Sequence, residues 1–380
     1  MLSVVAAAFA LAPPLNDRIG RRDVLQRATA TAAGSLLPLT AAPLPSAAAS
    51  PKEKLILPKL GLGAWAWGDR LFWGYNEKQD ADLSDVFDYA LSKGVTFFDT
   101  AELYGPGRSE ELLGQFAARS PQSDQIQVAT KFAALPWRTK PGDVLEAAKR
   151  STDRLGRPID LYQIHFPNAW ANEAYWEGLG QCVDSGLVKA AGVSNYGVDA
   201  MRACNAKLAT YGVPLTSNQI QLSLLYPYPL QNGLIKACDD LGVQVLAYSP
   251  LCLGLLTGKF RKPDKLPDGP RKALAEKYLD DPKFGELLAT MTDLGAKNHG
   301  GANAAQMALA WCTAKGASVI PGARTVSQAA SNIAAAKIKL SADEVARLDA
   351  AAAEVTLVVN PQTNPFPKKD VFTGLAMYDS

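Results

Sequence analysis

Residue types that bind metal ions are scarce in this chain. Its 380 residues include only 2 histidines, and the 5 cysteines stand singly at positions 182, 204, 238, 252 and 312, with no CxxC pair. Zinc sites need several histidines or cysteines, and a disulfide framework needs an even set of cysteines at short spacings. We therefore expect neither a metal centre nor a disulfide scaffold.

An excess of charge of one sign is also missing. Lys and Arg number 39 against 37 Asp and Glu. Four of the arginines and two of the acids lie in the first 50 residues, which leaves 35 of each in the remainder. A nucleic-acid groove or a polybasic membrane face needs excess positive charge, and no apolar run approaches the ~18–20 residues of a membrane-spanning helix. The composition predicts a globular protein without a nucleic-acid partner or a transmembrane segment, and it leaves the oligomeric state open.

Residues 1–50 differ in composition from the rest of the chain. They contain neither Lys nor Glu and are rich in Ala, Leu, Pro, Ser and Thr. A short apolar run at Leu2–Ala12 precedes the pair Arg21-Arg22, and small residues follow at 46–49. These are the parts of a targeting sequence, and the twin arginine resembles a Tat-type signal. We expect a cleavable leader over residues 1–50; the alternative is an Ala-rich tail with a chance arginine pair.

From residue 54 onward, short apolar runs alternate with amphipathic helical patterns. Eight strand-like runs over about 270 residues predict an α/β protein of the (β/α)8 TIM-barrel type. The competing doubly wound sheet needs a Gly-rich phosphate loop after its first strand, whereas the first strand here continues into Trp65 and Trp67. The expected strands are Leu60–Gly63, Val95–Asp99, Ile126–Phe132, Ile159–His165, Val188–Val193, Thr216–Gln221, Val243–Tyr248 and Ala317–Pro321.

The domain organisation follows from this rhythm. We expect one barrel over residues 51–355 and a Pro-rich C-terminal tail over residues 356–380, which carries Phe366, Phe372 and Tyr378. Gly, Pro and Lys interrupt the rhythm at Cys252–Asp281, so an irregular excursion should follow the seventh strand.

Four polar residues stand where a barrel places its chemistry, at the carboxyl ends of its strands. Asp99, Lys131 and His165 end three successive strands, and Tyr104 lies in the loop after Asp99. Charged residues in apolar strands need partners, and Asp99 can pair with Lys131. A nearby cation lowers the pKa of a tyrosine by about 1–3, so we expect Lys131 to make Tyr104 a general acid near neutral pH. Neutral His165 could hydrogen-bond the same oxygen, an arrangement that fits hydride transfer to a carbonyl.

The residues around these positions resemble the aldo-keto reductases, a family of NADPH-dependent carbonyl reductases on a (β/α)8 barrel. The resemblance covers about residues 54–355, and the family's tetrad falls on Asp99, Tyr104, Lys131 and His165 without substitution. Within the family, residues 63–68, 131–138 and 269–271 look like the plastid-targeted plant reductases, which include pyridoxal reductase. The most specific segments are Phe98-Asp99-Thr100-Ala101-Glu102-Leu103-Tyr104-Gly105, Thr130-Lys131-Phe132, Gly192-Val193-Ser194-Asn195-Tyr196 and Ile320-Pro321-Gly322-Ala323-Arg324.

The same resemblance implies a set of NADPH-binding residues. The carboxamide of the nicotinamide would be bound by Ser194, Asn195 and Gln219, the ring would stack on Tyr248, and backbone around Ser249, Leu251 and residues 254–256, including Gly254, would hold the pyrophosphate. The adenosine 2′-phosphate and adenine would be bound by Arg324, Gln328 and Asn332. Arginine suits phosphate because its guanidinium is a planar fork of donors. Many members of the family place a Lys where this chain has Gly322, so NADPH preference would rest mainly on Arg324.

The substrate pocket is less clearly marked. Trp65, Trp73, Trp137, Phe166 and Trp170 follow barrel strands and could surround a flat carbonyl compound, or some could simply cap the barrel. Pyridoxal is one candidate substrate.

Two other functions compete with a reductase. One is a redox-sensing subunit, as in the potassium-channel β subunits that share this fold and tetrad; slow turnover with tight cofactor retention would favour it. The other, an isomerase or aldolase, lacks a predicted phosphate loop with a catalytic Glu or a metal cluster.

The resemblance and the leader together predict a plastid protein. We favour the stroma, or peripheral association with the thylakoid surface, because NADPH is generated on the stromal side. The twin arginine leaves the thylakoid lumen open.

Overall fold

The computed structural model describes residues 52–168, 170–263, 265–269 and 271–357. The expected leader over residues 1–50 lies outside these ranges, as does all of the expected tail except its first two residues. Pro270 of the segment 269–271 is also outside them.

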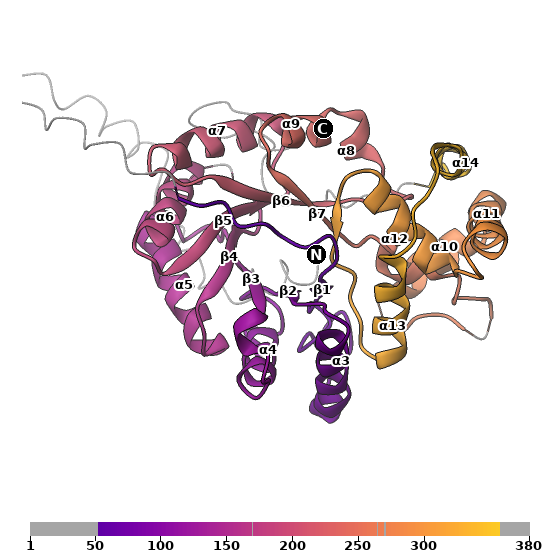
Figure 1. Ribbon diagram of the computed structural model, residues 1–380, viewed down its shortest axis with the longest axis horizontal. Coiled ribbons are helices and arrows are strands. Elements are labelled where there is room, and N and C mark those ends of the chain that lie inside the picture. The colour runs from indigo at the N-terminus through magenta and orange to yellow at the C-terminus, as the bar shows by residue number, and fades with distance from the viewer. Residues whose placement is uncertain (1–51, 169, 264, 270, 358–380) are drawn as a thin grey trace, which may run out of the picture.

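Eight parallel strands form one sheet in the order of the sequence, β1 to β8. Figure 1 shows this arrangement from β1 to β7. The sheet closes on itself because Val319 donates to the carbonyl of Lys59 at 2.9 Å and Gly61 donates to that of Val319 at 2.9 Å. The predicted (β/α)8 barrel is therefore confirmed. The strands are β1 (Leu62–Gly63), β2 (Phe97–Asp99), β3 (Gln127–Phe132), β4 (Ile159–Ile164), β5 (Val188–Ser194), β6 (Leu215–Gln221), β7 (Gln244–Tyr248) and β8 (Ser318–Val319).

Helices alternate with these strands and cover the outside of the barrel. They are α3 (Asp80–Ser92), α4 (Arg108–Ala118), α5 (Pro141–Leu155), α6 (Asn172–Asp184), α7 (Val198–Ala209), α8 (Tyr228–Gln231), α9 (Leu234–Asp240), α12 (Ala304–Ala314) and α13 (Val326–Ala335). Glycines with a left-handed backbone conformation follow several of the helices. Gly156, for example, caps the end of α5 with a φ of 62°, and glycine adopts this conformation at little cost. Short 3₁₀ turns are η1 (Glu77–Gln79), η2 (Ser123–Gln125) and η3 (Cys252–Thr257).

Three further helices lie beside the barrel. They are α10 (Arg271–Leu279), α11 (Pro282–Asn298) and α14 (Ala342–Ala353), and Figure 1 shows them gathered on one side of the sheet. The expected irregular excursion at Cys252–Asp281 is thus partly helical, because Arg271–Leu279 is rich in strong helix formers. None of the helices in the described part of the chain has the length and apolar character needed to cross a membrane.

The interior of the barrel is apolar at one end and polar at the other. Apolar side chains of five strands form an interior cluster: Phe97, Ala129, Leu161, Ala190 and Leu246. Side chains two positions apart on a strand point to the same face. The next inward positions along these strands are occupied by Asp99, Lys131, Gln163, Gly192 and Tyr248. The change from apolar to polar places the chemistry at the carboxyl ends of the strands.

Candidate active site

A buried ion pair lies at the centre of the site. Lys131, which is 0% exposed, donates from Nζ to Asp99 Oδ1 at 2.5 Å and to the carbonyl of Thr100 at 2.8 Å. Burial lowers the pKa of Lys131, and the charge of Asp99 and its hydrogen bond act in the opposite direction. Breaking such a pair on one side leaves an uncompensated buried charge, so the two residues depend on one another.

The second carboxylate oxygen of Asp99 is held by two amides. Gln219 donates from Nε2 to Asp99 Oδ2 at 2.7 Å, and Gln163 donates from Nε2 to the same oxygen at 3.2 Å. The first of these was expected to bind the nicotinamide, whereas Gln163 was not singled out. The signal that could have found it is its place on β4 two residues before His165, because side chains two positions apart on a strand point to the same face.

Tyr104 differs from the expectation. Lys131 Nζ lies 3.5 Å from the Tyr104 hydroxyl and 5.0 Å from the centre of its ring, but the pKa of Tyr104 is raised well above its ordinary value, first by burial and then by the charge of Asp99. The expected lowering by Lys131 is therefore wrong, because burial disfavours the charged phenolate and the nearby negative charge of Asp99 disfavours it further. The consequence is a phenol that holds its proton firmly.

His165 lies directly after β4, beside the tyrosine. Its ring meets that of Tyr104 edge-on at 5.7 Å. Burial, and then the charge of Lys131, lower the pKa of His165 well below its ordinary value, so the imidazole is neutral, as expected. Among the described residues, its buried Nδ1 atom has no hydrogen-bond partner.

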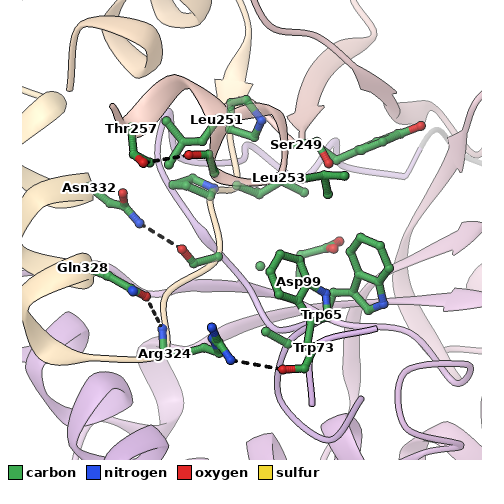
Figure 2. A pocket seen from close by; sticks show the side chains of 18 of the residues that line it. Trp65, Trp73, Asp99, Ser249, Leu251, Leu253, Thr257, Arg324, Gln328 and Asn332 are labelled. Atoms are coloured by element: carbon green, nitrogen blue, oxygen red, sulfur yellow. Dashed lines mark hydrogen bonds between the residues drawn. The ribbon is translucent and has the colours of Figure 1, made fainter. Parts of the chain in front are cut away.

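These residues open into a cavity of about 480 Å³, whose wall includes Asp99, Tyr104 and His165. Figure 2 shows this wall from Asp99 to Asn332. Ten of the eleven expected cofactor residues line it: Ser194, Gln219, Tyr248, Ser249, Leu251, Gly254, Gly322, Arg324, Gln328 and Asn332.

The eleventh, Asn195, lies behind the wall and supports it. Asn195 donates to the carbonyl of His165 at 3.0 Å and accepts from the Tyr248 hydroxyl at 2.8 Å. Its φ of 63° is in the left-handed region, which is uncommon for residues other than glycine. Asn195 thus connects the position expected to stack the nicotinamide with the strand end that carries the histidine.

The segment after β7 has an unusual backbone. Ser249, Cys252 and Leu253 have φ of 49°, 47° and 56°, and Gly254 has φ of 95°. Such left-handed residues are costly outside glycine and occur mostly at ligand sites. Turns of this kind can aim successive backbone N–H groups at an anion.

Three cations surround the far end of the cavity: Lys259, Arg271 and Arg324. None of them pairs with a carboxylate within 4.0 Å in the part of the chain that the structure describes. Burial lowers the pKa of each. The charges of Arg271 and Arg324 lower the pKa of Lys259 further, and the charge of Arg324 lowers that of Arg271, while the charge of Asp268 acts to raise the pKa of both arginines. The Nε atom of Arg271 is buried without a partner among the described residues. A cluster of mutually repelling, unpaired cations is suited to a polyanionic ligand.

Trp73 lies between two of these cations. The guanidinium carbons of Arg271 and Arg324 are 4.4 and 5.7 Å from the centre of its ring. Arg324 also donates to the carbonyl of Trp73 at 3.1 Å, and its own N–H donates to Gln328 Oε1 at 2.8 Å, as drawn in Figure 2. The sequence pattern did not single out Lys259 or Arg271, although Arg271 lies in one of the segments that resemble the plant reductases.

The expected substrate residues divide into two groups. Trp65, Trp73 and Phe166 line the cavity, and the ring of Trp65 lies 6.1 Å from that of Tyr104. Trp137 is 50% exposed, and neither it nor Trp170 is part of the cavity wall. The aromatic wall beside the tyrosine is therefore smaller than the sequence predicted.

Comparison with known proteins agrees with this geometry. The family model described as "Aldo/keto reductase family" matches residues 59–353. The chain is 40% identical over 312 residues to "Pyridoxal reductase, chloroplastic" of Arabidopsis thaliana, covering 78% of this chain and 83% of that protein. It is 28% identical to "Aldo-keto reductase yakc [NADP(+)]" of Schizosaccharomyces pombe, covering 70% and 81%. A solved thermostable aldo-keto reductase in complex with the inhibitor epalrestat superposes with a TM-score of 0.62 at 29% identity, covering 78% of this chain and 95% of that one.

Proposed function

Because the chain belongs to the aldo/keto reductase family, we propose that this oxidoreductase uses NADPH to reduce an aldehyde or ketone to the alcohol, with Tyr104 as the proton donor. The observation that carries the proposal is the arrangement of the cavity. A buried Lys131–Asp99 pair and a protonated phenol stand at one end, and a cluster of unpaired cations stands at the other.

The described residues fit an NADP cofactor. The cations Lys259, Arg271 and Arg324 lack carboxylate partners and could hold its phosphates, which arginine binds through charge-assisted hydrogen bonds. The turn at residues 252–254, the hydroxyl of Ser194 and the amide of Gln219 would face the rest of the molecule. When bound, NADPH supplies the hydride; the chain's relatives include one whose name carries NADP(+).

The chain's own residues supply the proton and the orientation. A buried, protonated Tyr104 can donate to an oxygen that gains negative charge, and such general acid catalysis contributes about 10²–10⁴ in rate. Lys131, held charged by Asp99, stabilises the phenolate left behind, since its Nζ is 3.5 Å from that oxygen. Neutral His165 lines the same wall and offers a hydrogen bond to the carbonyl oxygen.

For the substrate we propose a flat aromatic aldehyde, with pyridoxal as the first compound to test. Trp65 and Phe166 provide an apolar wall at the Tyr104 end of the cavity, and Trp73, in contact with Trp65, continues that wall toward the cations. The Arabidopsis relative is named for pyridoxal reduction. An apolar cavity with a few polar groups at one end is typical of small-molecule sites.

We further propose that residues 1–50 are a removable leader, that residues 51–355 form the working barrel, and that residues 356–380 are a tail. The location would be a plastid, in the stroma or at the thylakoid surface. The composition of the leader and the chloroplastic relative support this location.

The proposal is tested by following NADPH oxidation with a panel of aldehydes and ketones that includes pyridoxal, benzaldehyde and an aliphatic aldehyde. We expect turnover with NADPH, a preference for the aromatic aldehydes, and much weaker activity with NADH. A protein that retains NADPH tightly but turns over no member of the panel would contradict the reductase and favour a sensing role.

A further inference from the structure

Lys131 and three further residues, a glutamine, a glycine and a serine, lie at the same level of the barrel on four neighbouring strands. Lys131 on β3 is paired in register with Gln163 on β4, Gln163 with Gly192 on β5, and Gly192 with Ser217 on β6. Gln163 is completely buried. A buried amide with hydrogen-bonding capacity has to be satisfied locally, because an unsatisfied polar group in the interior is costly.

The Gln163 amide forms one hydrogen bond to Asp99 and one to Ser217. Its Nε2 donates to Asp99 Oδ2 at 3.2 Å, and its Oε1 accepts a longer bond from Ser217 Oγ at 3.5 Å. Gln219 is the other donor to Asp99 Oδ2, but Gln219 lines the cavity, whereas Gln163 does not. A molecule bound in the cavity can therefore contact Gln219, but it cannot contact Gln163 or displace its hydrogen bond to Asp99.

Gly192 provides the space in which Gln163 lies. A Cβ atom at Gly192 would come within 2.5 Å of Ser217 Oγ and 2.9 Å of Gln163 Cγ. Gly192 is not among the glycines with positive φ, so its backbone conformation does not require glycine. The close approach of two neighbouring side chains does.

We propose that Gln163 is a positioning residue for the reaction: its amide, given room by Gly192, fixes Asp99 against Lys131 from the interior of the barrel. This inference rests on the proposed reductase function and concerns how its proton donor is kept ready. Gln163 touches neither substrate nor cofactor and acts only through Asp99.

The charge of Asp99 determines in which direction the pKa values of its neighbours should move when its position changes. The negative charge of Asp99 raises the pKa of Tyr104 and also acts to raise that of Lys131. Tyr104 and Lys131 are close enough to titrate as a coupled pair. If Asp99 is held less firmly, this pair should lose its first proton at a lower pH. The other titratable groups that act on this couple are Asp69, Glu110, His165 and Tyr248.

The test is the pH dependence of kcat for carbonyl reduction in Gln163→Met, which keeps the side-chain length and removes both hydrogen bonds. We expect kcat to fall about tenfold, the effect of one modest hydrogen bond to a charged group. We also expect the alkaline limb of the profile to move down by about one pH unit. NADPH affinity, measured by fluorescence titration, should stay within about twofold of wild type, because Gln163 does not line the cavity.

Two further variants separate positioning from general destabilisation. Gly192→Ala should reproduce the shifted alkaline limb, because the added methyl would lie within 2.9 Å of Gln163 Cγ and must displace that side chain. Thermal unfolding shows whether this variant is folded. Gln244→Met is the matched control: Gln244 opens β7 at the opposite end of the barrel and bonds Ser318 and the backbone of Leu57. It should lower the melting temperature without moving the pH profile.

A folded Gln163→Met with the wild-type alkaline limb would overturn the inference and leave the proposed function untouched. If that variant does not fold, Gly192→Ala decides by the same criterion. A wild-type protein without carbonyl reduction would overturn the proposed function itself, so the two failures are distinguishable.

Discussion

Replacing Tyr104 by Phe should separate catalysis from folding, because the structure gives the hydroxyl almost no structural role. Its one hydrogen bond within the described residues comes from Lys131 Nζ at 3.5 Å. The ring contacts with Trp65 and His165, at 6.1 and 5.7 Å between centroids, do not involve the oxygen. A long neutral–cation hydrogen bond is worth little, so we expect the free energy of unfolding to fall by less than about 1 kcal/mol.

The effect on rate should be much larger. A positioned general acid contributes about 10²–10⁴ in rate, which corresponds to about 2.7–5.4 kcal/mol of transition-state stabilisation. Burial keeps the pKa of Tyr104 well above its ordinary value, so wild-type kcat for reduction should be constant through the neutral range and decline only at alkaline pH. NADPH affinity should be nearly unchanged, because Phe preserves the ring.

The assay is single-turnover reduction of an aromatic aldehyde with saturating NADPH, followed by loss of cofactor fluorescence. Thermal unfolding and NADPH titration of the same preparation show whether the variant is folded and loaded. Retention of more than about a tenth of the wild-type single-turnover rate constant would refute the general-acid assignment.

The other predictions concern the cofactor, a helix end and the leader. Arg324→Ala should weaken NADPH binding by about 1.5–3 kcal/mol and hardly affect NADH, since the lost contact is a charge-assisted bond to the 2′-phosphate; equal weakening in a fluorescence titration would place that phosphate elsewhere. Burial acts to raise the pKa of Glu344, but hydrogen bonds from Ser341, Asn298 and His299 prevail and lower it to about 2. Its folded-state pKa thus lies below the unfolded value, so Glu344→Gln should cost about 1 kcal/mol at neutral pH. In urea unfolding that difference should shrink as pH falls from about 4 towards 2. N-terminal sequencing of the protein from fractionated plastids should find a terminus near residue 50, and an intact Met1 in the cytosol would contradict the targeting hypothesis.

Local patterns were enough for the fold. The alternation of apolar runs with helical patterns predicted all eight strands. The expected bounds differ from the observed ones by one to three residues, and most strands came out shorter, β1, β2 and β8 most of all. A parallel strand buried on both faces must be apolar, so its signal lies within a few consecutive residues. Three of the four proposed catalytic residues were predictable for the same reason, because Asp99, Lys131 and His165 are polar residues at the ends of apolar strands.

The sequence could not show which of the polar groups lie closest to one another across the barrel. Lys131 was expected to lower the pKa of Tyr104, but the structure places Asp99 at 2.5 Å from the ammonium and the hydroxyl at 3.5 Å. Burial then sets the direction for the phenol. Electrostatic effects depend on the separation of the charges and on the dielectric environment, and neither can be read from the sequence.

The chain by itself therefore determined the barrel, the end of the barrel that carries the chemistry, and the residue types found there. Only the tertiary structure decided which side chains share the site. It brought Lys259 and Arg271 from the excursion after β7 to Arg324 after β8, left Trp137 half-exposed, and directed Gln163 to Asp99. The physical reason is that strand patterns arise from local burial and alternation, whereas a site is assembled by the closure of the barrel, which joins segments far apart in sequence.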